Sequence, residues 1–136
     1  MKNMLFAVIL LFSFSLSAQD IQDISYLKVK QNSCIKRNGP SIILNSASSD
    51  SRCPEGVTCI WAGEIKVVVS VYQDKKFITE KILTISGKNN LENIAWFAQY
   101  LPVDKRNVKS ISVVPYPKKG LKIKPNDYYI RLGYIK

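Results

Sequence analysis

The stretch "IKVVVSVYQDKKFITEKILTI", residues 65–85, contains the clearest secondary-structure pattern in the chain. Isoleucine or valine recurs at every second position from Ile65, which predicts a β-strand over residues 65–72 with one apolar face. Four polar residues, 73–76, then predict a hairpin loop, and a second strand returns over residues 77–85. Its alternation is imperfect around Lys81 and Ile82, which predicts either a β-bulge or burial of both faces.

Similar short runs, rich in β-branched and aromatic residues and separated by turn residues, occur on both sides of this hairpin. They predict further strands over residues 25–30, 41–45, 108–114 and 128–135. Residues 91–98 favour a short helix behind a potential Asn90 cap, although Trp96 and Phe97 lie off its apolar stripe. We therefore expect an all-β domain, an antiparallel sandwich or barrel-like fold of about seven short strands, with at most this one short helix.

The N-terminal residues are expected to lie outside this fold. Residues 1–18 have the organisation of a secretory signal peptide: a charged start, a short apolar core and small residues before Ala18. Cleavage is expected after Ala18, with Gln19 as the alternative, and leaves a single β domain over residues 19–136. Because no cysteine lies at this junction, a lipid anchor is disfavoured, and we expect a secreted or periplasmic protein.

The composition excludes several kinds of chemistry. The sequence contains no histidine. This absence rules out Ser-His-Asp and Cys-His catalysis, and it rules out the ordinary zinc and copper sites that include histidine. We expect neither a catalytic constellation nor a metal or cofactor.

Basic charge is concentrated near the C-terminus. Residues 104–136 contain nine basic and two acidic side chains, a net charge of +7. Four of the lysines lie close together in one loop-like stretch with tyrosine neighbours: Lys118, Lys119, Lys122 and Lys124. Such a cluster can bind nucleic acid outside the cell, anionic polysaccharide or lipid headgroups. The alternative is a solvated cationic surface that only keeps the domain soluble.

Cys53 and Cys59 enclose five residues, among them Pro54 and Gly56, which allow so short a ring to turn back on itself. In an exported protein this spacing predicts an intramolecular disulfide, worth about 2 kcal/mol by the chain-entropy estimate. The ring could instead be a recognition loop that presents Glu55 and Thr58, a redox pair or a metal site. The last two are weaker hypotheses, because the spacing is neither C-x-x-C nor that of a zinc site.

The residues next to the ring have structural and chemical interpretations. Trp61 is expected to pack on the sulfurs or to cover the edge of the core, and Gly63 to allow a bulge or a close backbone approach. Asp50 is expected to build a turn, while Arg52 pairs with a nearby carboxylate such as Glu64. An acid–base pair of Asp50 and Glu64 is the catalytic alternative.

Cys34 has no obvious partner in the sequence. We expect a buried free thiol, with pairing to another chain or competition for one of the ring cysteines as alternatives.

Residues 50–64 match the pattern D-S-R-C-P-x-x-V-x-C-x-W-A-G. This pattern resembles a signature of small exported bacterial proteins and lipoproteins that are mostly uncharacterised. "VVPYP", residues 113–117, and "DYYIRL", residues 127–132, are similar to later strands of that family. The resemblance implies a secreted β-sandwich-like domain in which the two ring cysteines are bonded, and it implies no substrate or cofactor. The motif residues to which we assign a structural role are Asp50, Arg52, Pro54, Trp61, Gly63 and Glu64.

The sequence therefore predicts an exported, non-enzymatic binding module with a preference for anionic partners. The expected partner is an anionic polysaccharide, a lipid headgroup or an envelope protein. The second hypothesis is a protease-inhibitor-like protein that presents the ring of residues 53–59. A third, an enzyme that uses Asp50, Glu64 or Cys34, has no nameable activity.

Overall fold

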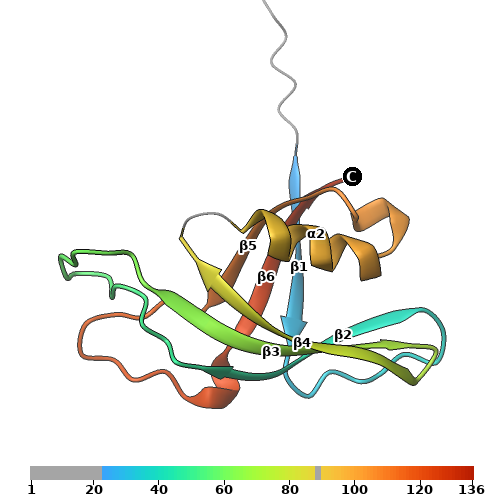
Figure 1. The fold of residues 1–136 in the computed structure, drawn as a ribbon, viewed down its shortest axis with the longest axis horizontal. Coiled ribbons are helices and arrows are strands. Elements are labelled where there is room, and N and C mark those ends of the chain that lie inside the picture. Colours follow the sequence, from blue (N-terminus) through green and yellow to red (C-terminus); the bar gives the residue numbers. More distant parts are fainter. Residues whose placement is uncertain (1–22, 88–89) are drawn as a thin grey trace, which may run out of the picture.

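The computed structural model describes residues 23–87 and 90–136. Two antiparallel three-stranded sheets enclose the core, and a helix lies over the edge between them (Figure 1). The elements, in chain order, are β1 (Ile24–Lys30), β2 (Pro40–Ser48), β3 (Glu64–Gln73), β4 (Lys76–Ser86), α2 (Leu91–Tyr100), β5 (Val108–Val114) and β6 (Tyr129–Ile135), with short 3₁₀ turns at Val103–Lys105 and Pro125–Asp127. The all-β prediction with one short helix is thus confirmed for the described residues, whereas the expected signal peptide lies outside them.

The strand orders are β2-β3-β4 in one sheet and β1-β6-β5 in the other. All six strands that the sequence predicted by range are present, but residues 23–87 and 90–136 contain no seventh strand. The long connection between β5 and β6 is a loop because Pro115, Pro117 and Pro125 interrupt it, and proline cannot donate to a strand ladder.

β3 forms the centre of its sheet and of the core. Ile65, Val67, Val69 and Val71 are all almost completely buried, as their alternation predicted. The apolar face of β3 packs opposite residues of the second sheet, among them Ile130 of β6, which is equally buried.

The β3–β4 hairpin turns tightly. Asp74 and Lys75 both have positive φ, 51° and 66°, which is the conformation that suits a two-residue hairpin loop. The predicted bulge is present, but its place was wrong. Tyr72 pairs with Phe77 and Val71 with Thr79, so that Ile78, and not the region around Lys81, is the extra residue.

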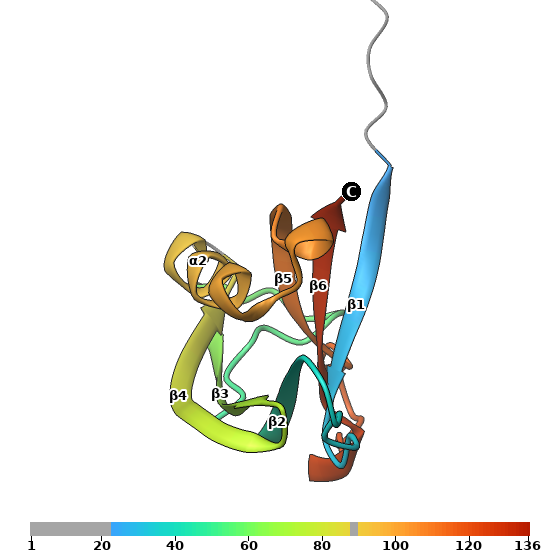
Figure 2. The same cartoon turned by 90° about the vertical axis from the view of Figure 1, so that its right-hand side faces the viewer.

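α2 lies beside β4 and β5 and covers the core where the two sheets diverge (Figure 2). Its buried residues are Trp96 and Phe97, the two that lay off the expected stripe, whereas Leu91 is exposed. Asn90 occupies the expected N-cap position, but its side chain makes no capping hydrogen bond to the helix. The Asn90 amide donates to the Ser86 carbonyl instead (2.6 Å). The helix thus turns the face with its largest apolar side chains toward the core, and not the face that the sequence pattern predicted.

The described residues include no helix with both the length and the apolar character that crossing a bilayer requires.

Candidate functional site

Two loops project from the same end of the sandwich (Figure 1). We call the connection between β2 and β3, residues 49–63, the ring loop, and the connection between β5 and β6, residues 115–128, the lysine loop. The backbone N–H of Glu55 donates to the carbonyl of Pro117 (2.9 Å), and the N–H of Lys119 donates back to the carbonyl of Glu55 (3.2 Å). The ammonium of Lys118 lies 3.4 Å from the carboxylate of Glu55. The disulfide ring and the lysine cluster, which the sequence suggested separately, therefore form one continuous surface.

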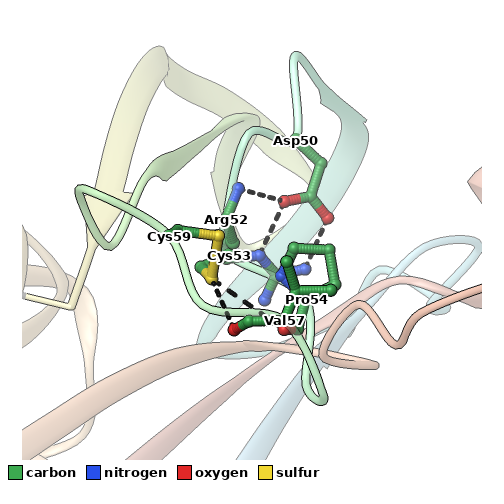
Figure 3. The surroundings of a disulfide bond; sticks show 6 residues. All are labelled: Asp50, Arg52, Cys53, Pro54, Val57 and Cys59. Carbon is green, nitrogen blue, oxygen red and sulfur yellow. Dashed lines mark hydrogen bonds and ion pairs between the residues drawn. A yellow bond between two sulfur atoms is a disulfide. The ribbon is translucent and has the colours of Figure 1, made fainter.

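Cys53 and Cys59 form the predicted disulfide, with their Cα atoms 5.9 Å apart (Figure 3). The base of the ring loop is closed by backbone hydrogen bonds. The N–H of Ser51 donates to Glu64 and the N–H of Cys53 to Ala62, each at 2.9 Å. Within the ring, the N–H of Val57 donates to Pro54 (3.2 Å). Covalent and hydrogen-bonded closure together leave this loop few alternative conformations.

Arg52 anchors the ring loop to the opposite sheet. Its guanidinium donates to the carbonyls of Val113, at the end of β5, and of Pro115 (3.0 Å to the latter), and the residue is only 8% exposed. Asp50 receives two further hydrogen bonds from the same guanidinium, at 2.8 and 2.7 Å (Figure 3). Such a bidentate pair is both strong and directional.

Arg52 pairs with a nearby carboxylate, as expected, but this carboxylate belongs to Asp50 and not to Glu64. Asp50 also accepts a hydrogen bond from the backbone N–H of Arg52 (3.2 Å), as aspartate does in turns. The turn therefore holds the Asp50 carboxylate against both the backbone N–H and the guanidinium of Arg52.

Two tyrosines of the lysine loop complete the anchor. The hydroxyl of Tyr128 donates to Asp50 (3.0 Å), and the ring of Tyr116 lies 5.0 Å from the guanidinium carbon of Arg52. Partial burial acts to raise the pKa of Asp50, but the hydrogen bonds and the charge of Arg52 outweigh it, so that the pKa lies below its usual value of 3.8. Burial and the Asp50 carboxylate raise the pKa of Tyr128 above 10.0.

This arrangement does not support the acid–base hypothesis for Asp50 and Glu64. A carboxyl group that donates a proton near neutral pH needs a raised pKa, whereas that of Asp50 is lowered. The Asp50 oxygens are also occupied by Arg52 and Tyr128. Asp50 is placed to hold the loop and not to exchange protons with a substrate.

The two residues after the ring that carried predictions differ in outcome. Gly63 has φ of +72°, and a Cβ atom there would lie 1.9 Å from the carbonyl oxygen of Ser51, so the expected close backbone approach is confirmed. Trp61, by contrast, is 64% exposed and does not cover the edge of the core. Its neighbour Ile60 is fully exposed. Gly63 thus lies between the exposed residues 60 and 61 and the buried Ile65 of β3.

The lysine loop exposes all four lysines of the predicted cluster: Lys118, Lys119, Lys122 and Lys124. Lys118 pairs with Glu55. The other three form no ion pair with any residue in the described ranges, so their charges face solvent. Leu121, between them, is 67% exposed.

Cys34 is a free cysteine but an exposed one, so the expectation of burial was wrong. It belongs to the irregular connection between β1 and β2, where no strand ladder draws its side chain inward. It borders a shallow cavity of about 180 Å³ with Tyr100 and Lys105. The ring cysteines bond to each other, so Cys34 takes neither of them.

The sequence did not indicate that Tyr128 and Tyr116 hold the ring loop. The only available signal was that "VVPYP" and "DYYIRL" accompanied the ring motif in the resemblance, and each contains one of these tyrosines. Within residues 23–87 and 90–136, no three cysteine, aspartate or glutamate side chains gather in a way that could hold a metal ion.

Comparisons of the chain with protein-family models, with curated protein sequences and with solved structures found no match. The resemblance of residues 50–64 to a family of exported proteins therefore stays a prediction.

Proposed function

We propose that the protein is an exported, non-enzymatic binding module that holds an anionic partner on its lysine loop. The observation that carries this proposal is the position of Lys119, Lys122 and Lys124. These side chains are exposed, and their charges are not neutralised by ion pairs within the described part of the chain. Three lysines within six positions attract negative charge more strongly than isolated surface lysines do.

The way in which the lysine loop is held supports a binding role. The ring loop bonds to its backbone at Glu55, and the Arg52–Asp50 pair joins both loops through Tyr128. A loop that is ordered before binding loses less conformational entropy on association. Lysine rather than arginine in the cluster favours diffuse attraction to a polyanion over bidentate recognition of one group.

The non-enzymatic part of the proposal rests on the lack of histidine and on the engagement of Asp50 in an anchor. The disulfide is compatible with an oxidising compartment outside the cytoplasm. Secretion or export to a periplasm is proposed from the sequence of residues 1–18.

Retention on immobilised heparin, a polyanion, tests the function. The protein should be retained at low ionic strength and released as salt is added, because exposed charges are screened within about 10 Å at 0.1 M salt. Replacing Lys119 and Lys122 with glutamine should shift elution to lower salt. The double replacement of Lys75 and Lys76 removes the same charge at the β3–β4 hairpin and serves as the control. Lack of retention of the wild-type protein at low salt would refute the proposal.

Exposure of the ring favours a second candidate, a protein-blocking domain of the protease-inhibitor kind. The ring residues from Glu55 to Cys59 are all exposed and covalently closed. Replacing Thr58 with alanine should abolish inhibition of a target protease without unfolding the domain. Replacing Glu55 is a less clean test, because its carboxylate pairs with Lys118. Unchanged inhibition in the Thr58 variant would exclude the ring as the inhibitory element.

A further inference from the structure

The end of the molecule that carries the lysines also exposes large apolar side chains. Ile60 is fully exposed, and Trp61 and Leu121 are 64% and 67% exposed. The first two belong to the ring loop and the third to the lysine loop, and both loops project from one end of the sandwich (Figure 1). Single exposed apolar residues are ordinary on protein surfaces, but a group on two neighbouring loops indicates an interaction site.

These side chains cannot withdraw easily into the fold. The disulfide, the Cys53–Ala62 and Ser51–Glu64 hydrogen bonds and the close packing of Gly63 against the backbone of Ser51 fix the backbone on both sides of Ile60 and Trp61. Ile65, near the start of β3, already fills the adjacent core position, since it is completely buried. The ring loop therefore presents an isoleucine and a tryptophan to whatever lies outside.

We propose that this end of the protein docks on an anionic lipid bilayer. Ile60 and Trp61 enter the boundary between headgroups and acyl chains, and Lys119, Lys122 and Lys124 lie at the headgroup phosphates. Tryptophan favours the membrane interface because its ring is apolar while its N–H can bond to water or headgroups. Lysine can lay its methylene chain along apolar material and keep its ammonium among the phosphates. The inference rests on the proposed function and names its partner.

The apolar side chains favour a bilayer over a soluble polyanion. A polysaccharide or nucleic acid in solution would engage the lysines but would provide no apolar phase for Ile60 and Leu121. A bilayer with anionic headgroups provides both, since it attracts clustered lysines over about one Debye length and then accepts apolar side chains at the interface. Charge and apolar exposure occur here on the same pair of joined loops.

The experiment compares three probes with the mature protein, residues 19–136. These are vesicles of equimolar phosphatidylcholine and phosphatidylglycerol, vesicles of phosphatidylcholine alone, and soluble heparin. Cosedimentation should show binding to the anionic vesicles at least about tenfold tighter than to the neutral ones, because each lysine near the surface contributes about a factor of five. Tryptophan emission should shift to the blue on binding, and brominated lipid should quench it.

Two variants locate the contact. Trp61→Phe should remove the blue shift, since the remaining Trp96 is buried in the core already. Ile60→Ser together with Trp61→Ala should weaken vesicle binding by about tenfold or more and leave heparin binding unchanged. The controls are Ile82→Ser, a change at an exposed apolar residue on β4, and the Lys75 and Lys76 replacements at the opposite hairpin. These should not affect vesicle binding.

The outcomes separate this inference from the proposed function. Two outcomes would overturn the bilayer as partner and leave a polyanion-binding module. The first is heparin binding without vesicle binding, and the second is vesicle binding that the Ile60 and Trp61 replacements do not weaken. Equal binding to neutral and anionic vesicles would overturn it as well. Binding to none of the three probes at low salt would remove the proposed function itself.

Discussion

The guanidinium group of Arg52 donates a hydrogen bond to the backbone carbonyl of Val113, 61 positions further along the chain. This bond connects the ring loop, which joins β2 and β3 of one sheet, with the end of β5 in the other sheet. Because Asp50 and Tyr128 complete the same network, the two loops of the proposed binding end share one partly buried anchor. The stability of the domain and the shape of its binding end are therefore linked.

Replacing Arg52 with methionine should strongly destabilise the domain. The change leaves the Asp50 carboxylate partly buried without its cation and removes the donors to Val113 and Pro115. We expect the free energy of unfolding to fall by about 3 kcal/mol, as is usual when one partner of a buried ion pair is lost. Denaturant titration measures it. Arg37→Met, at an exposed position, is the control and should change stability by less than about 0.5 kcal/mol.

Asp50 should make the stability of the domain sensitive to acid. Its pKa is lower in the folded protein than the ordinary 3.8, so the unfolded chain takes up a proton first as the pH falls. The stabilisation by Asp50 is therefore complete above the unfolded pKa and is lost as the pH falls through the folded pKa. In Asp50→Asn, which starts from a lower stability, the loss between about pH 5 and pH 2 should be smaller than in the wild type. Parallel stability curves for the two proteins would contradict this role.

Gly63 and Gly39 form a matched pair of positions. Both have positive φ, +72° and +86°, but only at Gly63 would a Cβ atom meet backbone, 1.9 Å from the oxygen of Ser51. Gly39→Ala should lower the free energy of unfolding by about 1 kcal/mol from the left-handed conformation alone. Gly63→Ala should lower it by at least about 2 kcal/mol more, because the ring loop must move away from the start of β3. Equal losses of unfolding free energy in the two variants, measured by thermal and denaturant unfolding, would mean that the ring loop can move away from Gly63 at little cost.

Removal of the disulfide should destabilise the domain by about 2 kcal/mol, the chain-entropy value for so short a ring. The double variant Cys53→Ser and Cys59→Ser should also lose part of its heparin affinity, because the ring loop supports the backbone of the lysine loop at Glu55 and Lys119. Cys34→Ser is the matched control, since this cysteine is free and exposed; we expect its stability and binding to match those of the wild type. Undiminished heparin affinity in the ring variant would show that the lysine loop holds its shape alone.

The strands were predictable because each depends on a local pattern. In β3 the apolar residues Ile65, Val67, Val69 and Val71 are buried at every second position, as the alternation in residues 65–72 predicted. The disulfide was predictable for a similar reason, since two cysteines six positions apart around proline and glycine are already close. The helix was predicted near its observed range, but its apolar stripe was wrong because the burial of Trp96 and Phe97 depends on how α2 packs against β4 and β5.

The predictions that were wrong concern side chains whose partners are distant or whose burial depends on other elements. Cys34 and Trp61 are both exposed, although each was expected to be buried or to cover the core. The ion-pair partner of Arg52, Asp50, is close in the sequence. The hydrogen bond from Arg52 to Val113 in the other sheet could not be predicted from residues 50–64.

The sequence by itself determined the strands, the disulfide ring and the concentration of lysine near the C-terminus, because periodicity, short ring closure and charge are properties of neighbouring residues. Only the tertiary structure decided that the ring and the lysines are one surface. Glu55 meets Pro117, Lys118 and Lys119 because Arg52 and Asp50 join two sheets whose residues are far apart in the chain. Such contacts follow from how the sheets pack, and no pattern within either segment encodes them.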